Sequence, residues 1–103
     1  MKAEIIPGLN REHSSPDDIV ALAAYQYGLK PEVIKGRSRL LKICESRYYA
    51  MYLLRKRTDL TLDEIGKMLN RDHSTALYGV RVIEDRISVN QMLVEISKDV
   101  IKK

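Results

Sequence analysis

The 103-residue sequence has a single cysteine, Cys44, and contains neither tryptophan nor phenylalanine. One cysteine excludes an intramolecular disulfide and any metal site built from several thiolates. We expect Cys44 to be a buried small apolar residue in a cytoplasmic protein. No hydrophobic run approaches the roughly 20 residues of a membrane span, and the N-terminus lacks the layout of a signal peptide. The sequence therefore predicts neither a disulfide scaffold nor a membrane protein.

Motifs that bind nucleotides or metals, or that carry covalent catalysis, are missing as well. There is no Gly-x-x-x-x-Gly-Lys-Ser/Thr loop to hold the phosphates of a nucleotide, so we expect no ATPase module. The two histidines, His13 and His73, have no cysteine or acidic partners at metal-ligand spacing. No nucleophile and base occur together in the pattern of an activated nucleophile. We therefore expect no enzyme activity, no metal and no cofactor.

What the sequence does contain is a globular composition with an uneven distribution of charge. Hydrophobic residues make up 45% and charged residues 31% of the chain, which suits one domain with a modest core. The net charge is +4, but residues 30–57 alone carry nine basic and two acidic side chains. Such a concentration is typical of a surface that meets nucleic acid, although a solvated basic face would have the same composition.

The segment 61–69 has the pattern of a short amphipathic helix. Thr61 and Glu64 form the capping-box arrangement that begins a helix. Apolar residues then recur at helical spacing, namely Leu62, Ile65, Met68 and Leu69. Asn70 interrupts the pattern, and asparagine is one of the few non-glycine residues that accepts a left-handed backbone. The sequence therefore predicts a helix that ends in a tight turn near Asn70.

A second helix is predicted directly after this turn, with Asp72 suited to its N-cap. Its apolar stripe consists of Ala76, Val80, Ile83 and Ile87. The opposite face carries Ser74, Tyr78, Arg81 and Asp85. Two helices joined by so short a turn must cross at a steep angle, which is the arrangement of a helix-turn-helix.

The first turn of this second helix is polar throughout, with Arg71, Asp72, His73, Ser74 and Thr75 in succession. A helix N-terminus favours phosphate through its free N–H groups and its dipole. Helix-turn-helix proteins read base edges with the first residues of their second helix. The alternative is that the polar run is only a solvated cap. His73 also lies near the buried side of the helix, so a packed or capping histidine competes with a base-reading one.

At these residues the chain resembles the C-terminal DNA-binding domain of the bacterial replication initiator DnaA. The similarity consists of the pair Ile65-Gly66, the turn Leu69-Asn70-Arg71-Asp72-His73-Ser74-Thr75, and Leu77, Arg81 and Ile83. It extends more loosely from about Ser15 to about Val100. Three positions depart from the family pattern, namely Ala76, Gly79 and Val82. The resemblance implies an all-α helical bundle whose helix-turn-helix binds double-stranded DNA.

A basic loop, residues 35–39, precedes the helix-turn-helix and contains Arg37, Ser38 and Arg39. A loop of this kind can lay guanidinium groups against phosphates or into a minor groove. In the DnaA-like domains a similar Arg-x-Arg loop reaches into the minor groove, and the resemblance implies the same for Arg37 and Arg39. The interval from this loop to the next matching arginine, Arg47, is longer than in the family pattern.

A helix is predicted over 40–57, a segment without proline or glycine. Its apolar stripe consists of Leu40, Cys44, Met51 and Leu54. Arg47 projects from the same face, where an unpaired charge would be costly to bury. Either the helix is broken near Glu45 and Ser46, or Arg47 lies at an edge and meets the DNA backbone. The resemblance implies the second, because it aligns Arg47 with a phosphate-contacting arginine.

The remaining segments complete the domain. Residues 1–14 show little periodicity, so we expect a loose N-terminal arm, followed by the domain at 15–103. Ser15 and Pro16 are typical of a helix start, and Gly28 is suited to end this first helix.

At the other end of the chain, Ser88 or Asn90 is suited to cap a last helix. Its apolar stripe would be Val89, Leu93, Ile96 and Val100. We expect this helix to seal the core against the first helix.

We therefore predict an all-α domain, located in the cytoplasm at the nucleoid, that binds double-stranded DNA in replication initiation or its regulation. Base reading is assigned to Arg71, Asp72, His73, Ser74 and Thr75. Phosphate or minor-groove contacts are assigned to Arg37, Ser38, Arg39, Arg47 and Arg81. We expect a monomer, with other replication proteins as further partners. The alternatives are a transcription regulator with an unrelated site, and a protein-interaction module that has lost DNA binding.

Overall fold

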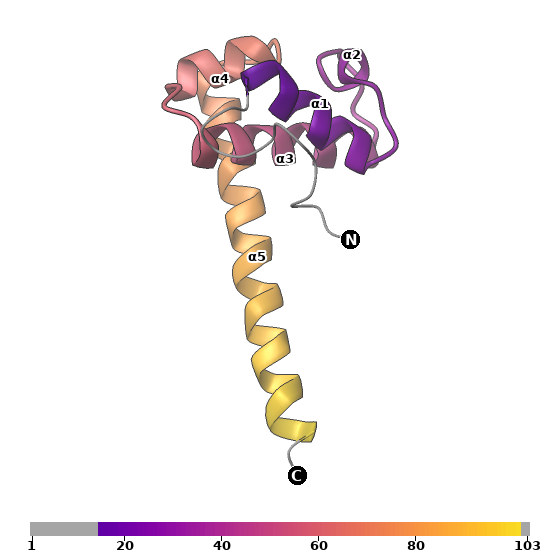
Figure 1. Ribbon diagram of the computed structural model, residues 1–103, viewed down its shortest axis with the longest axis vertical. Helices are drawn as coiled ribbons and strands as arrows, with labels where there is room; N and C mark the ends of the chain where they lie inside the picture. Colours follow the sequence, from indigo (N-terminus) through magenta and orange to yellow (C-terminus); the bar gives the residue numbers. More distant parts are fainter. Residues whose placement is uncertain (1–14, 102–103) are drawn as a thin grey trace.

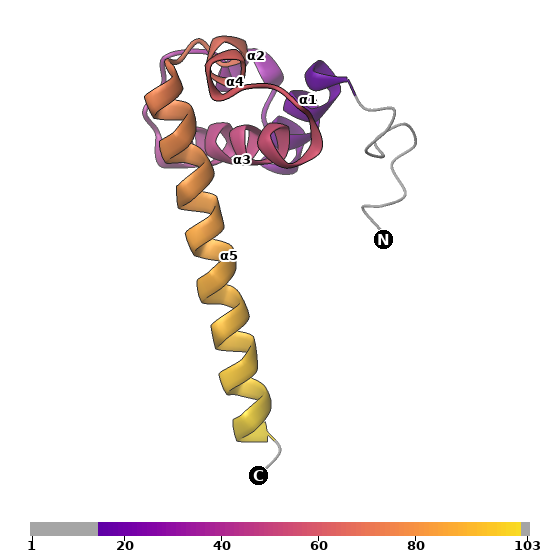
Figure 2. The same cartoon turned by 90° about the vertical axis from the view of Figure 1, so that its left-hand side faces the viewer.

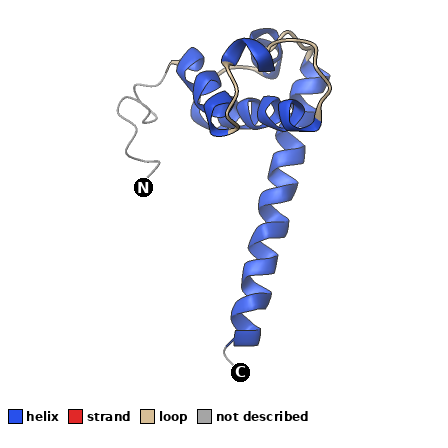
Figure 3. Ribbon diagram, turned by 90° about the vertical axis from the view of Figure 1, so that its right-hand side faces the viewer, coloured by secondary structure: helices blue, strands red, loops and turns tan. Residues whose placement is uncertain are grey.

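The computed structural model describes residues 15–101, with side chains as far as Gln91. The predicted arm at 1–14 lies outside the described residues. The helices are α1 (Pro16–Gln26), α2 (Pro31–Ile34), α3 (Leu41–Arg57), α4 (Leu62–Met68) and α5 (His73–Ile101) (Figure 1). The described part contains no strand (Figure 3). The prediction of an all-α fold is confirmed. None of the described helices has both the length and the hydropathy to cross a bilayer.

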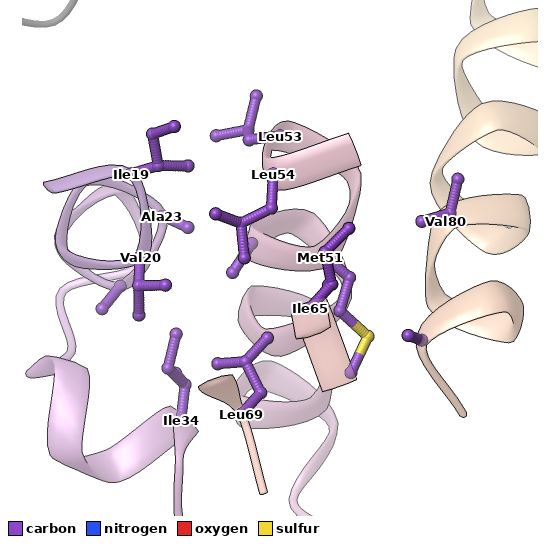
Figure 4. Close-up of a cluster of buried hydrophobic side chains, with 13 residues drawn as sticks. Ile19, Val20, Ala23, Ile34, Met51, Leu53, Leu54, Ile65, Leu69 and Val80 are labelled. Carbon is purple, nitrogen blue, oxygen red and sulfur yellow. The ribbon is translucent and has the colours of Figure 1, made fainter. Parts of the chain in front are cut away.

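Helix α3 is the centre of the fold, because α1, α2, α4 and α5 all pack against it. The core lies where these helices meet (Figure 4). Its largest fully buried apolar side chains are Ile19, Val20, Ile34, Met51, Leu54, Ile65 and Leu69. All five helices contribute to the core, since Ala76 and Val80 of α5 belong to the same cluster.

The predicted helix starts are made by side-chain caps. The Ser15 hydroxyl accepts a hydrogen bond from the Asp18 amide at 3.1 Å. At the start of α4 the capping box is complete, because the Thr61 hydroxyl accepts from the Glu64 amide at 3.1 Å and the Glu64 carboxylate accepts from the Thr61 amide at 2.8 Å. These bonds satisfy amides at helix N-termini that have no partner within the helix.

The turn between α4 and α5 is tight because glycine stands at one of its contacts. Asn70 has φ +58°, the left-handed conformation that its sequence position predicts. The Arg71 amide donates to the Gly66 carbonyl oxygen at 2.7 Å. A Cβ at Gly66 would lie 2.6 Å from the Arg71 carbonyl oxygen and 2.8 Å from that of Asp72. Helix α4 and the chain entering α5 can approach this closely only because position 66 has no side chain.

The structure excludes one alternative for α3, the break, and corrects two expectations, those for Leu40 and Cys44. The helix is unbroken at Glu45 and Ser46, and the Ser46 hydroxyl is satisfied in the core because it donates to the Ala23 carbonyl oxygen at 3.0 Å. Leu40 does not belong to the apolar stripe, since it lies before the first turn as the N-cap and is 69% exposed. Cys44 is half-buried rather than buried.

The separate last helix is also a wrong prediction, because α5 continues without a break from His73 to Ile101. No glycine or proline occurs between 80 and 101, and residues such as Ser88 and Asn90 that suit a helix cap are also tolerated inside a helix. The C-terminal half of α5 extends away from the other helices in two perpendicular views (Figures 1 and 2). It therefore does not close the core against α1, and Val89 is 52% exposed.

Candidate nucleic-acid interface

The first turn of α5 presents its polar side chains to solvent. Asp72, His73 and Ser74 are exposed and Thr75 is half-buried. The exposure of His73 contradicts the alternative of a packed histidine. The Asp72 carboxylate accepts a hydrogen bond from the Thr75 amide at 2.9 Å, which confirms Asp72 as the cap and lowers the pKa of its carboxyl. The cap bond from the Thr75 amide uses Oδ1 of Asp72, so it does not involve Oδ2.

The exposed face of α5 continues from this turn along the helix. Arg81 is exposed and lies two turns beyond Ser74 on the same side. Between them Tyr78 is 58% exposed, and its ring packs edge-to-face with the Tyr48 ring, with centroids 5.5 Å apart. The sequence placed Tyr78 on the exposed face but assigned it no contact. Its spacing of four residues from Ser74 was the signal that could have added it to the site.

Close packing behind this face depends on Gly79. A Cβ at Gly79 would lie 2.5 Å from the Met51 sulfur and 2.9 Å from Cδ1 of Tyr48. Glycine at a position that departs from the family pattern thus lets α5 approach α3, and it leaves room for the Tyr48 ring that supports Tyr78.

The basic loop 35–39 lies directly beside the turn between α4 and α5. The Asn70 side-chain amide donates to the Lys35 carbonyl oxygen at 2.9 Å, and Arg71 Nη2 donates to the Gly36 carbonyl oxygen at 2.7 Å. The side chains of Arg37 and Arg39 are exposed. Residues 35 positions apart in the sequence therefore bring the loop and the start of α5 together.

Arg47, which the resemblance assigns to a phosphate contact, is buried and its guanidinium is bound within the protein. Its residue exposure is 3%, and its guanidinium donates to the carbonyl oxygens of Ile34 at 2.7 Å, Gly36 at 3.2 Å and Ser38 at 3.1 Å. A buried arginine is tolerated where its N–H groups find partners. The sequence offered only a broken helix or an edge contact, whereas the structure satisfies the guanidinium inside the protein.

Arg71 is half-buried, and part of its guanidinium is also bound within the protein. Besides its bond to Gly36, it donates through Nη1 to the carbonyl oxygens of Leu69 at 3.0 Å and Asn70 at 3.1 Å. Burial and the neighbouring charge of Arg47 lower its pKa. Ser38 is likewise engaged, because its hydroxyl accepts from the Leu40 amide at 3.2 Å.

The loop, the turn and the first half of α3 enclose a hollow of about 890 Å³. Its cationic lining residues are Lys35, Arg37, Arg39, Arg47 and Arg71. No aspartate or glutamate is among the described residues that line it. Such a hollow attracts an anion, because several positive charges converge there without a carboxylate to neutralise them.

Comparison with known proteins identifies one family and a set of relatives. The family described as "Bacterial dnaA protein helix-turn-helix" matches residues 16–83. A chromosomal replication initiator protein DnaA from Herpetosiphon aurantiacus is 35% identical over 92 residues, which are 88% of this chain and 20% of the relative. The protein of the same name from Picosynechococcus sp. is 36% identical over 88 residues, 84% of this chain and 20% of the relative. That from Tropheryma whipplei is 40% identical over 72 residues, 70% of this chain and 15% of the relative. The chain thus spans about a fifth of the length of these curated relatives.

Proposed function

The chain belongs to the bacterial DnaA helix-turn-helix family, and we propose that it binds double-stranded DNA sequence-specifically, in the initiation of replication or its regulation. The observation that carries this proposal is the joining of two exposed polar elements at one place: the first turn of α5 and the loop 35–39, linked by the bond from Arg71 to the Gly36 carbonyl. DNA is contacted by helix-turn-helix proteins through the start of the second helix, and by basic loops through phosphates or the minor groove.

In this proposal the start of α5 enters the major groove, which is wide enough for a helix. The exposure of His73 and Ser74 supports their role as readers of base edges. Asp72 can accept a hydrogen bond from a cytosine amino group through the carboxylate oxygen that does not cap the helix, and the methyl group of Thr75 suits a thymine methyl. Arg81, further along the same face, is suited to a phosphate.

The loop would lie in the minor groove next to that major groove. Arg37 and Arg39, both exposed, are suited to the negative potential of a narrow minor groove. One sugar-phosphate strand separates a minor groove from the adjacent major groove, and the hollow between loop and turn, with its cationic lining, is where this strand would pass. Arg71 lines the hollow at the side of the turn and is suited to a phosphate of this strand.

The test is a selection of bound sequences from random duplexes, followed by affinity measurements on the enriched sequence and on a random duplex. We expect a reproducible motif. His73→Ala and Ser74→Ala should each cost roughly 1–3 kcal/mol of binding on the motif and little on random DNA, because a lost base contact removes discrimination. Ser88→Ala is the matched control for Ser74→Ala, since both are exposed serines of α5.

Equal losses on both duplexes would remove His73 and Ser74 from the readers. An enriched motif unrelated to initiator sites would favour a transcription regulator. Absent or salt-insensitive DNA binding would contradict the proposal and favour a protein-interaction module, because phosphate contacts make DNA affinity depend on salt.

A further inference from the structure

We propose that Arg47, which lines the hollow, is a positioning residue: it sets the sequence preference of the protein through the basic loop, which it holds in place beside the start of α5. The inference rests on the proposed function. It differs from the role that the resemblance implies for Arg47, which is a direct phosphate contact.

The first observation is that one guanidinium binds three backbone carbonyl oxygens, one at the end of α2 and two in the loop. The carbonyl oxygens of Ile34, Gly36 and Ser38, at alternate positions, all accept hydrogen bonds from Arg47. The other backbone bonds in this region end at Gly36, whose amide donates to the Val33 carbonyl oxygen. From residue 37 to 39 the chain has neither helix nor strand, so its path depends on the side chain of Arg47.

The second observation is that the same loop is also bound by the turn before α5. The Gly36 carbonyl oxygen accepts from Arg71 as well as from Arg47, and the Lys35 carbonyl oxygen accepts from the Asn70 amide. Arg47 belongs to α3, whereas Asn70 and Arg71 belong to the turn that begins α5. The loop is therefore fixed between α3 and the turn, and the distance from Arg37 to the reading residues is set before DNA is bound.

A fixed distance matters because the two grooves of a duplex lie at a fixed offset. A loop that is already ordered loses less conformational entropy on binding than a mobile one. It also favours sequences whose minor groove lies where the loop already is, so a loosened loop should lower affinity for the preferred site more than for random DNA. Buried at 3% exposure, Arg47 acts on DNA through the loop.

The substitution Arg47→Lys distinguishes a phosphate contact from a positioning role, because it keeps the positive charge and removes the planar guanidinium with its several N–H donors. An ammonium on a flexible stem cannot reach three carbonyl oxygens arranged around a guanidinium. A phosphate contact would survive Arg47→Lys in large part. A positioning role would be lost, although the substituted side chain is still cationic.

The experiment is a double-mutant cycle between Arg47→Lys and Arg37→Ala, measured as affinity for the selected duplex. We expect Arg47→Lys alone to weaken binding roughly tenfold, within the range shown by coupled neighbours. In the Arg37→Ala background the same change should cost about twofold or less, because the loop contact through which Arg47 acts is already lost. The matched cycle with Arg81→Ala, a residue of α5 that does not line the hollow, should give fold-changes that multiply.

A second variant covers the case that Arg47→Lys does not fold. Asn70→Gly removes the bond to the Lys35 carbonyl but keeps the turn, because glycine adopts the left-handed φ of +58° without steric strain. It should show the same coupling to Arg37→Ala. In the free protein, the amides of Gly36 and Leu40, which donate to the Val33 carbonyl oxygen and the Ser38 hydroxyl, should exchange faster in both variants, while exchange in α4 stays unchanged.

Simple loss of fold would lower the active fraction equally in every background, so its fold-changes would multiply. Multiplying fold-changes for Arg47→Lys with Arg37→Ala, or unchanged amide exchange in the loop, would overturn the positioning role while leaving the proposed function intact. Absence of DNA binding by the wild-type protein would overturn both.

Discussion

At the scale of single residues, the helix-turn-helix has two buried glycines, Gly66 and Gly79. Each allows a close contact between helices, but the atoms that a side chain would meet can move to different degrees. A Cβ at Gly66 would meet the carbonyl oxygens of Arg71 and Asp72, which belong to the backbone of the turn. A Cβ at Gly79 would meet the Met51 sulfur and the Tyr48 ring first. Met51 is a flexible side chain that can move aside, whereas the turn cannot shift without changing the angle between α4 and α5.

We therefore expect Gly66→Ala to lower the free energy of unfolding by about 1–2 kcal/mol, because overpacking against fixed atoms exceeds the gain in helix propensity. Gly79→Ala should cost less, since the gain of roughly 1 kcal/mol in propensity offsets much of the adjustment of Met51 and Tyr48. Urea unfolding of both variants measures the difference. A larger loss for Gly79→Ala than for Gly66→Ala would show that α3 and α5 are packed more rigidly than the turn.

Single residues also mark the limit of what the sequence predicts. The left-handed Asn70, the Asp72 cap and the buried stripe of α5 were predictable, because each depends on neighbours within four residues. Arg47 was not, since the carbonyls that satisfy it belong to a segment nine to thirteen residues away with no periodic pattern. Periodicity shows that a charge falls on an apolar face, but it cannot show which backbone oxygens will meet it.

At the scale of elements, the start of α5 carries a charge that both caps the helix and faces the proposed DNA site. Hydrogen bonds from Thr75 hold the pKa of the Asp72 carboxyl below its ordinary value of 3.8. The native protein therefore binds a proton at Asp72 less readily than the unfolded chain does. This contribution to stability is present above the ordinary pKa and is lost as the pH falls through the lowered pKa of the native state.

The variant Asp72→Asn tests this contribution, because asparagine caps a helix about as well as aspartate but does not titrate. At neutral pH we expect the two proteins to have similar urea midpoints. As the pH falls below 3.8, the wild type should lose stability that the variant keeps. Parallel pH profiles would show that the hydrogen bond from Thr75 does not favour the charged carboxylate.

The bounds of the helices were predictable to different degrees, because only some of them are marked by capping residues in the sequence. Helices α1 and α4 begin at strong local caps, so their starts at Pro16 and Leu62 follow from the sequence. The continuation of α5 past Ser88 and Asn90 had no such signal, since both residues suit a cap but are also tolerated inside a helix. Predicting one continuous helix would have required giving the absence of glycine and proline between 80 and 101 more weight than these two possible caps.

At the scale of the whole molecule, the basic segment 30–57 has two ends with different surroundings. One end is the loop, where the described lining of the hollow has no carboxylate. The other is the last turn of α3, where Lys56 forms an ion pair with Glu84 at 3.3 Å. At 1.5 Å per residue, α3 separates these ends by about 25 Å. The composition showed the excess of charge, and the fold adds that the loop end borders a hollow whose described lining has no carboxylate.

We therefore expect the salt dependence of DNA affinity to come from the arginines of the loop, at one end of α3, and not from those at the other end. Each phosphate contact that is lost lowers the slope of log K against log salt concentration by about 0.9. If Arg37 and Arg39 both bind near phosphates, the double change Arg37→Ala with Arg39→Ala should lower the slope by roughly 2. Arg55→Ala removes an exposed cation from the far end and should leave the slope unchanged. Equal changes in slope for both ends would mean that the duplex lies along the whole of α3, because only then would both groups of arginines release counterions.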